Sequence, residues 1–361
     1  MLARVSSSMP NDTPRHLRIV LVGGTGFIGR HLVEQLTRLG HRVTVYHRGD
    51  HEPPLPSGVR HVHSPIAARP VVGFPDELTA PGCDVVVAMH LVGERDARAL
   101  ADAFRGVARR VVALSSGDVY RVYGVLRGTE EGPPDPTPLT EEAPLRTKLY
   151  PYRGGRAGPF DPETYEKILA EREVARHAEL PATILRLPVI FGPGDDLHRF
   201  FPTIKRIDDG RRAFLLEERL AAWRWTHGYV ENVAHAIVLA IDREEAAGRI
   251  YNVGERATPS VAERVGRIAV TARWRGAIVL QEASKLPPYL VLPLHFEQPI
   301  IYDTSRLRRE LEYEEPVSET EALRRTIEWE RANPPEHLDP TQFDYAAEDQ
   351  ALREAGVKTG D

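Results

Sequence analysis

Residues 18–36, RIVLVGGTGFIGRHLVEQL, constrain the fold of this chain more than any other stretch. Their apolar beginning, IVLV, is typical of a strand buried on both faces of a parallel sheet. A turn containing Gly23, Gly26 and Gly29 follows, and apolar residues then recur at helical spacing from Leu32. Strand, glycine turn and helix in this order predict a dinucleotide site, with the pyrophosphate at the helix N-terminus.

The glycines of this turn have separate expected roles. Gly23 makes the tight turn, Gly26 lets the backbone approach the pyrophosphate, and Gly29 lets the helix pack closely on the strand. The other residues of the turn that we expect to contact the cofactor are Thr25, Phe27 and Ile28. The alternative interpretation is an ordinary strand-to-helix turn that happens to be rich in glycine.

The end of the second predicted strand, at residues 42–46, bears on which dinucleotide binds. In NAD sites an acidic residue here usually accepts hydrogen bonds from the ribose 2′-hydroxyl. This chain has His47 and Arg48 instead, and an arginine suits a 2′-phosphate. The sequence therefore favours NADP over NAD. Alternatively, Arg48 is a solvated loop residue that does not contact the cofactor. Asp50 is close enough in the sequence that NAD remains a possible cofactor.

Composition limits the function classes. The 361 residues exceed what one compact core usually holds, so we expect a large domain and a smaller lobe. A net charge of −5 argues against a nucleic-acid partner. A single cysteine, Cys83, fits a protein of a reducing compartment. We expect its side chain to be buried and to take no part in the chemistry. No run approaches the ~18 apolar residues of a membrane span or resembles a signal peptide, so we expect a cytoplasmic protein without membrane contact.

Alternating strand and helix patterns predict the fold class. Further buried strands are expected at residues 84–89, 110–114 and 183–187, with helices at 96–104 and 162–178. This alternation predicts an α/β fold, a Rossmann-type doubly wound parallel sheet with ligands at the carboxyl ends of its strands. The histidines of residues 51–81 follow no metal-ligand spacing, so we expect them at the surface and predict no metal site.

The predicted domain boundaries follow from where this alternation stops. The predicted segments are a disordered tail (1–16), an NAD(P)-binding domain (17–190) with a long proline-rich loop (121–164), a mixed substrate-binding lobe (191–335) and a C-terminal tail (336–361). A long segment without periodicity is usually a lid, an insertion or a disordered loop.

Several motifs in fixed order carry a family resemblance. They are the glycine motif 23–29, SSGDVY at 115–120, PLTEEAPL at 138–145, RLPVIFGPG at 186–194, YVENVA at 229–234 and YNVG at 251–254. Over residues 17–335 the chain resembles an extended short-chain dehydrogenase/reductase of the NAD-dependent epimerase/dehydratase family. The resemblance implies a Rossmann domain with a substrate lobe, a nucleotide-sugar substrate, and a homodimer formed through helices that flank the sheet.

The resemblance also assigns site residues. Family chemistry rests on a Tyr-x-x-x-Lys pair and a serine or threonine, and the matching residues are Tyr165 as acid/base and Ser116 as the group that orients the reacting oxygen. We further expect Ser115 and Pro188 at the cofactor. The lysine is missing, because position i+4 from Tyr165 is Leu169.

Lys167, at i+2, does not fit the role of that lysine if the segment is helical. On a helix about 200° separates it from Tyr165, which predicts a solvated side chain. Three interpretations stay open: an arginine from elsewhere, such as the long loop, supplies the cation; the reaction needs no strongly activated tyrosine; or the site has lost its chemistry and kept the cofactor.

The predicted function is therefore an NAD(P)-dependent oxidoreductase or epimerase/dehydratase. Hydride transfer would occur at a carbinol or carbonyl carbon of a nucleotide sugar or related polyol. The alternative is a catalytically impaired NAD(P)-binding protein that acts as a sensor or assembly partner. Arginines that could pair with a diphosphate are Arg199, Arg206 and Arg224. For Tyr120 and His227 we expect packing or pocket-lining roles.

Overall fold

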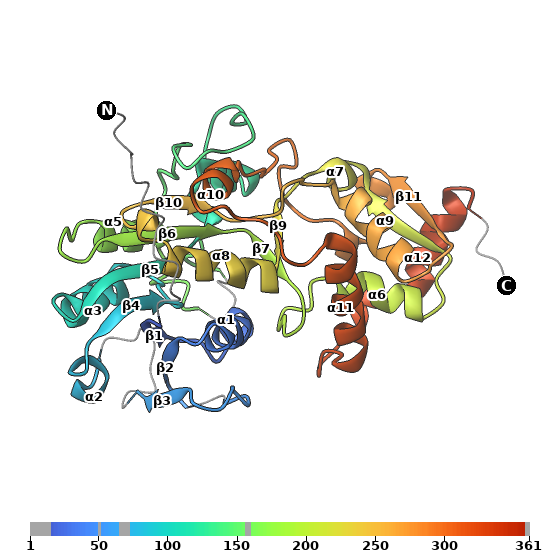
Figure 1. The fold of residues 1–361 in the computed structure, drawn as a ribbon. Coiled ribbons are helices and arrows are strands. Elements are labelled where there is room, and N and C mark those ends of the chain that lie inside the picture. Colours follow the sequence, from blue (N-terminus) through green and yellow to red (C-terminus); the bar gives the residue numbers. More distant parts are fainter. Residues whose placement is uncertain (1–15, 50–51, 65–72, 156–159, 358–361) are drawn as a thin grey trace, which may run out of the picture.

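The computed structural model describes residues 16–49, 52–64, 73–155 and 160–357. The disordered tail predicted at the N-terminus and Asp50 therefore lie outside the described residues, apart from residue 16. A large sheet-containing domain holds the N-terminal half, and a smaller lobe lies beside it with the C-terminus (Figure 1).

The described residues form a seven-stranded, entirely parallel main sheet, which confirms the predicted fold class. Its spatial order is β10-β6-β5-β4-β1-β2-β3. The strands are β1 (Arg18–Val22), β2 (Arg42–His47), β3 (Arg60–His63), β4 (Cys83–Ala88), β5 (Ala108–Ser116), β6 (Ala182–Leu187) and β10 (Ile250–Asn252). β1, β4, β5 and β6 are mostly apolar, as expected of strands covered on both faces, whereas the edge strand β3 is polar and largely exposed.

Two helical layers cover this sheet. α1 (Phe27–Arg38) packs against α8 (Val230–Asp242) on one face, and α3 (Glu94–Phe104) packs against α5 (Lys167–Ala175) on the other (Figure 1). The short α2 (Asp76–Thr79) adds Leu78 to the second layer. Cys83 is buried in that layer, as expected of a spectator.

The strand order reverses between β1 and β4. β1 leads outward to β2 and β3, and the chain then returns to β4 on the opposite side of β1. Parallel α/β sheets bind ligands outside the carboxyl ends of the strands at such a reversal. The glycine turn after β1 and the segment after β4 meet there, because a Cβ added to Gly23 would lie 2.5 Å from the His90 ring.

The long loop predicted at residues 121–164 begins with a helix instead. α4 (Arg121–Leu126) follows the 3₁₀ turn η1 (Gly117–Val119), and most of the remainder is irregular. Polar contacts hold this segment in place. Arg121 pairs with Asp135, and the Glu130 carboxylate accepts hydrogen bonds from Thr147 and from the backbone N–H of Lys148.

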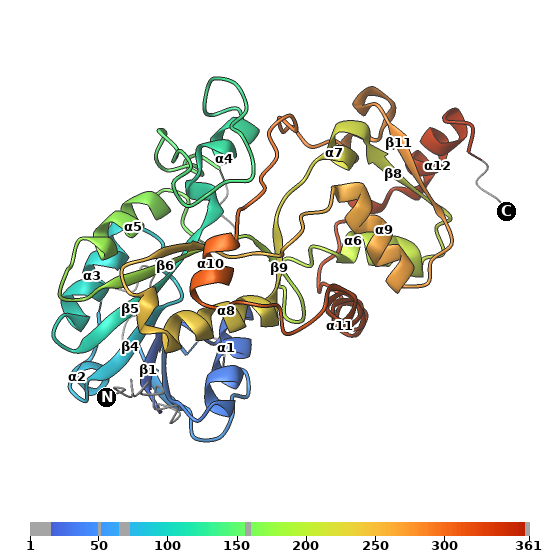
Figure 2. The ribbon, with the colours of Figure 1, turned by 45° about the horizontal axis from the view of Figure 1, so that its top comes forward.

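The smaller lobe is mixed α/β, as predicted, but its boundary is not a single point in the sequence. It consists of a two-stranded parallel sheet and surrounding helices: α6 (Phe201–Asp208), β8 (Ala213–Glu217), α7 (Glu218–Ala222), α9 (Val261–Thr271), β11 (Ala277–Gln281), α11 (Glu319–Ala332) and α12 (Tyr345–Glu354). Between these segments the chain returns to the main domain, where it forms α8, β10 and α10 (Ser305–Glu310) (Figure 2). β7 (Val189–Phe191) and β9 (His227–Tyr229) pair where the chain leaves and re-enters.

The C-terminal residues described by the structure are not a tail. α12 packs on β8, and its Ala351 and Leu352 are buried. Arg206 of α6 forms a buried ion pair with Glu348 of α12. Burial of apolar area stabilises α12, and the pairing with Arg206 offsets the cost of removing the Glu348 carboxylate from water. The segment suggested a tail because its own sequence is polar.

Replacing Leu352 with alanine tests this packing. The side chain is 1% exposed, so we expect a loss of about 2 kcal/mol in the free energy of unfolding. Chemical denaturation measures it. Leu338→Ala is the matched control, because Leu338 is 43% exposed, and it should leave stability nearly unchanged. Equal midpoints for Leu352→Ala and the unmodified protein would show that α12 does not contribute.

Within the described part of the chain, none of the helices combines the length and apolar character that crossing a bilayer requires.

Candidate active site

The glycine turn has the geometry of a phosphate cradle. Gly23 and Gly24 have φ values of +91° and +123°, which favour glycine. A Cβ on Gly29 would lie 2.3 Å from the Gly24 Cα, whereas a Cβ on Gly26 would meet no atom of the described residues within 4 Å. In the described part of the chain, no side chain caps the start of helix α1, and the space beside Gly26 is open. Its first backbone N–H groups are suited to bind phosphate oxygens.

The other predicted cofactor residues also lie at carboxyl ends of strands. Arg48 is half-buried directly after β2, Ser115 and Ser116 end β5, and Pro188 follows β6. The Ser115 hydroxyl donates a 2.5 Å hydrogen bond to Glu171 of α5. Ser115 is thus engaged in a buried polar network.

Tyr165 lies outside the helix on which the sequence placed it. The helix predicted at 162–178 is shorter: α5 begins at Lys167, and Glu166 is its N-cap in an extended conformation. The cause is the Glu166 carboxylate, which accepts a hydrogen bond from Ile168 N and forms a buried ion pair with Arg146. The Glu166 N–H is used as well, because it donates to the Val92 carbonyl.

Lys167 is consequently not solvated, and the expectation from helical rotation was wrong. It is 6% exposed, and its Nζ donates to the carbonyls of Leu91 (2.5 Å) and Leu114 (3.2 Å), near the ends of β4 and β5. The Nζ lies 5.7 Å from the Tyr165 ring centroid. Burial lowers the pKa of Lys167 to about 8, although the carboxylates of Asp118 and Asp96 oppose this shift.

The Tyr165 hydroxyl donates to a buried carboxylate. It lies 2.8 Å from Asp118 Oδ2, and both side chains belong to residues that are 5% exposed. Burial raises the pKa of Asp118 above its ordinary value, against the effect of Arg146. Burial and then Asp118 raise the pKa of Tyr165 well above its ordinary value, while Ser116 lowers it. The phenol therefore keeps its proton and points it at a carboxylate.

Further hydroxyl groups surround this carboxylate. Tyr152 donates to Asp118 Oδ2 at 3.1 Å, and its own oxygen lies 2.9 Å from the Tyr123 hydroxyl. The Ser116 side chain accepts a hydrogen bond from Asp118 N at 3.2 Å. Asp118 Oδ1 is buried and has no hydrogen-bond partner among the described residues. Such a group keeps spare acceptor capacity for a proton.

Sequence reasoning missed Asp118 and misplaced the cations. Asp118 belongs to the motif SSGDVY at residues 115–120. Its position just after a buried strand could have indicated a site carboxylate. The long loop does supply an arginine near Asp118, namely Arg146. Its guanidinium is already paired with the Glu166 carboxylate. The diphosphate role suggested for Arg206 does not fit the structure, because its guanidinium is used by Glu348 and backbone carbonyls. Arg199 is paired with Asp195.

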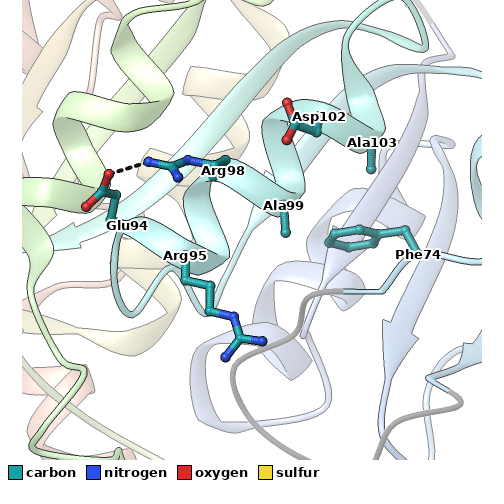
Figure 3. Close-up of a pocket in the computed structure, with 7 residues that line it drawn as sticks. All are labelled: Phe74, Glu94, Arg95, Arg98, Ala99, Asp102 and Ala103. Atoms are coloured by element: carbon teal, nitrogen blue, oxygen red, sulfur yellow. Dashed lines mark hydrogen bonds and ion pairs between the residues drawn. The ribbon is translucent and has the colours of Figure 1, made fainter.

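A surface hollow of about 640 Å³ lies elsewhere, along α3 (Figure 3). Phe74 forms one wall, and the Glu94–Arg98 ion pair lies at one end. None of the predicted cofactor or catalytic residues lines it. Because the predicted site residues lie at the carboxyl ends of β1, β2, β5 and β6, and the segment after β4 meets them, we place the candidate site at this edge of the sheet.

The comparison with protein families identifies the family of this chain. The NAD dependent epimerase/dehydratase family matches residues 19–74 and 95–254, which include the glycine turn, Asp118, Tyr165 and Lys167. The chain belongs to this family.

Individual relatives in the family catalyse different reactions. The chain is 28% identical over 252 residues to 2′-dehydrokanamycin reductase of Streptomyces kanamyceticus, a match that covers 66% of this chain and 62% of the reductase. It is 25% identical over 341 residues to UDP-N-acetyl-alpha-D-glucosaminuronate decarboxylase of Bacillus cytotoxicus, covering 87% of this chain and 98% of that protein. The structure of Bordetella bronchiseptica WbmG in complex with NAD and UDP superposes with a TM-score of 0.64 at 16% identity, over 90% of this chain and 99% of that one.

Proposed function

We propose that this protein is an NAD(P)-dependent oxidoreductase or epimerase/dehydratase that acts on a nucleotide sugar or related polyol. The observation that carries the proposal is the group formed by Tyr165, Asp118 and Lys167 at the carboxyl edge of the sheet that also carries the glycine turn. The family match and the relatives' names support both the cofactor class and the substrate class.

The residues of the turn fit a dinucleotide. The uncapped start of α1 and the space beside Gly26 suit the pyrophosphate. Thr25, Phe27 and Ile28 are half-buried in the same turn, and Arg48 follows β2, where the adenosine ribose is expected. When bound, the nicotinamide supplies hydride exchange with a substrate carbon.

The chain's own residues handle the proton of the substrate oxygen. During oxidation of an alcohol, the substrate hydroxyl proton passes to the Tyr165 oxygen as the Tyr165 proton passes to Asp118. The reverse transfer protonates the oxygen of a reduced carbonyl. Tyr165 therefore relays a proton and never accumulates as a phenolate, which explains how it works despite its raised pKa. Ser116 orients the same substrate oxygen.

Lys167 supplies the cation for this site in place of the family lysine missing at Leu169. Two backbone carbonyls fix its ammonium group near Tyr165 and Asp118. The positive charge stabilises the ionised carboxylate between turnovers. Lys167 acts through these neighbours, so we treat it as a positioning residue.

A pH profile tests Lys167. Because burial lowers the pKa of Lys167 to about 8, its ammonium form predominates below that pH and is lost above it. We expect kcat/KM to fall as pH rises through about 8. Lys167→Arg keeps the charge and should remove this alkaline limb. An unchanged limb in Lys167→Arg would assign the titration to another group.

Side-by-side titrations with NADPH and NADH test the cofactor. We expect NADPH to bind more tightly, and Arg48→Ala to weaken NADPH at least about tenfold, the effect of losing one hydrogen bond between charged groups. NADH affinity should stay unchanged. Arg42→Ala is the control, because Arg42 is exposed at the opposite end of β2. Preference for NADH, unaffected by Arg48→Ala, would make this an NAD enzyme.

One observation favours the impaired alternative, a cofactor-binding sensor or assembly partner. The pKa of Tyr165 is raised by its surroundings, whereas a cation at i+4 would lower it. A screen of nucleotide sugars with bound cofactor separates the two functions. Turnover that disappears in Tyr165→Phe supports the enzyme, and cofactor binding without any turnover supports the sensor.

A further inference from the structure

We propose that His47, Glu52 and His63 form a binding site for one divalent transition-metal ion of the Zn²⁺ type. The site lies at the outer edge of the main sheet, on β2, β3 and the segment after β2. The sequence spacing of these residues did not suggest a metal site, because strand pairing brings them together.

Strand register aligns the two histidines. β2 and β3 are parallel, and His47 is the direct partner of His63, so their side chains leave the same face of the sheet. The two ring centroids are 4.8 Å apart. Glu52 then reaches the pair from the following segment: His47 Nε2 lies 3.7 Å from Glu52 Oε1, and His63 Nε2 contacts the same oxygen directly.

These donor atoms converge within metal-binding distance. One ligand atom from each residue lies within 4.8 Å of the others. Ligands of a tetrahedral zinc ion lie roughly 3.3 Å apart, given bonds of about 2.0 Å, so small side-chain rotations would close the site. Imidazole nitrogen with carboxylate oxygen is a donor set that zinc prefers. A further imidazole is in reach, because His61 Nδ1 lies 3.0 Å from His47 Nε2.

One of the three side chains is buried and the other two are half-exposed, an arrangement that suits an ion-binding site. The His47 side chain is 4% exposed and forms the floor, while those of Glu52 and His63 are 46% and 55% exposed and leave a path for the ion.

The opposing cost is the loss of the cluster's own hydrogen bonds. His47 Nε2 gives up its 3.0 Å bond with His61 Nδ1, and His63 Nε2 exchanges its direct bond with Glu52 for the ion. Gly49 N donates to His47 Nδ1 at 3.2 Å, and ligation through Nε2 moves the ring proton to Nδ1. The Gly49 peptide must then turn away. A contact at the long end of the hydrogen-bond range is weaker than a metal–imidazole bond, so this change does not prevent binding.

Zn²⁺ titration of chelator-treated full-length protein, in competition with a chromophoric chelator, tests the site. We expect one equivalent to bind, and His63→Ala and Glu52→Gln each to weaken binding at least about tenfold. Both side chains are half-exposed, so these variants should keep the fold, which far-UV circular dichroism checks. Co²⁺ in place of Zn²⁺ should give the visible absorption of tetrahedral coordination, and this band should be lost in both variants.

His337→Ala is the matched control, because it removes an exposed histidine outside the cluster and should leave zinc affinity unchanged. Two results would overturn the proposal. One is the absence of stoichiometric Zn²⁺ binding, which would make the cluster a metal-free group of hydrogen-bonded imidazoles. The other is binding that His63→Ala and Glu52→Gln leave intact, which would place the ion elsewhere.

Discussion

Replacing Asp118 with asparagine is expected to lower kcat by about 10²–10⁴-fold, the usual contribution of a positioned proton acceptor. Asparagine keeps the size of the side chain and can still accept the 2.8 Å hydrogen bond from Tyr165, but it has no charge with which to take the proton. Steady-state kinetics with the substrate found in the nucleotide-sugar screen measures the effect. Cofactor affinity should change little, because Asp118 acts on the substrate oxygen through Tyr165.

The double variant decides whether the two residues act as a unit. If Tyr165 relays its proton to Asp118, then Asp118→Asn combined with Tyr165→Phe should be no slower than the slower single variant. Tyr152→Phe is the matched control, since it removes the other hydroxyl bound to Asp118 Oδ2 and leaves the relay intact. Full activity in Asp118→Asn alongside an inactive Tyr165→Phe would reduce Asp118 to a structural group.

Gly29→Ala is expected to destabilise the protein by about 3 kcal/mol or more. Its Cβ would lie 2.3–2.5 Å from the Gly24 backbone, and that contact can be relieved only by separating α1 from the turn. Denaturant unfolding measures the loss. We also expect cofactor binding to fail in the remaining folded protein, because the backbone N–H groups at the start of α1 move.

Gly26→Ala is the matched control for the same turn. Its Cβ would meet none of the atoms that the structure describes within 4 Å, so stability should stay within about 0.5 kcal/mol of the unmodified protein. Dinucleotide affinity should nevertheless fall, because the methyl group would occupy the space that we assign to the pyrophosphate. Unchanged affinity in Gly26→Ala would place the phosphates elsewhere, and unchanged stability in Gly29→Ala would show that α1 does not pack on Gly24 so closely.

The sequence by itself determined the parallel α/β fold, the position of the glycine turn and the family, because each depends on patterns within one segment or on the order of segments. The structure confirmed the fold, and the family match confirmed the family. The roles of the predicted site residues remain predictions. The C-terminal helix α12 escaped notice because its stabilising partners, Arg206 among them, are distant in sequence.

Only the tertiary structure decided what surrounds Tyr165. A local pattern predicted a helix over residues 162–178, which includes Tyr165. The Glu166 carboxylate, in a buried ion pair with Arg146, caps α5 so that the helix begins only at Lys167. Lys167 thereby turns inward to carbonyls at the strand ends, and Asp118 meets the tyrosine from another element. Charges in a low-dielectric interior must find partners wherever the chain offers them, and sequence periodicity carries no record of partners that are far away along the chain.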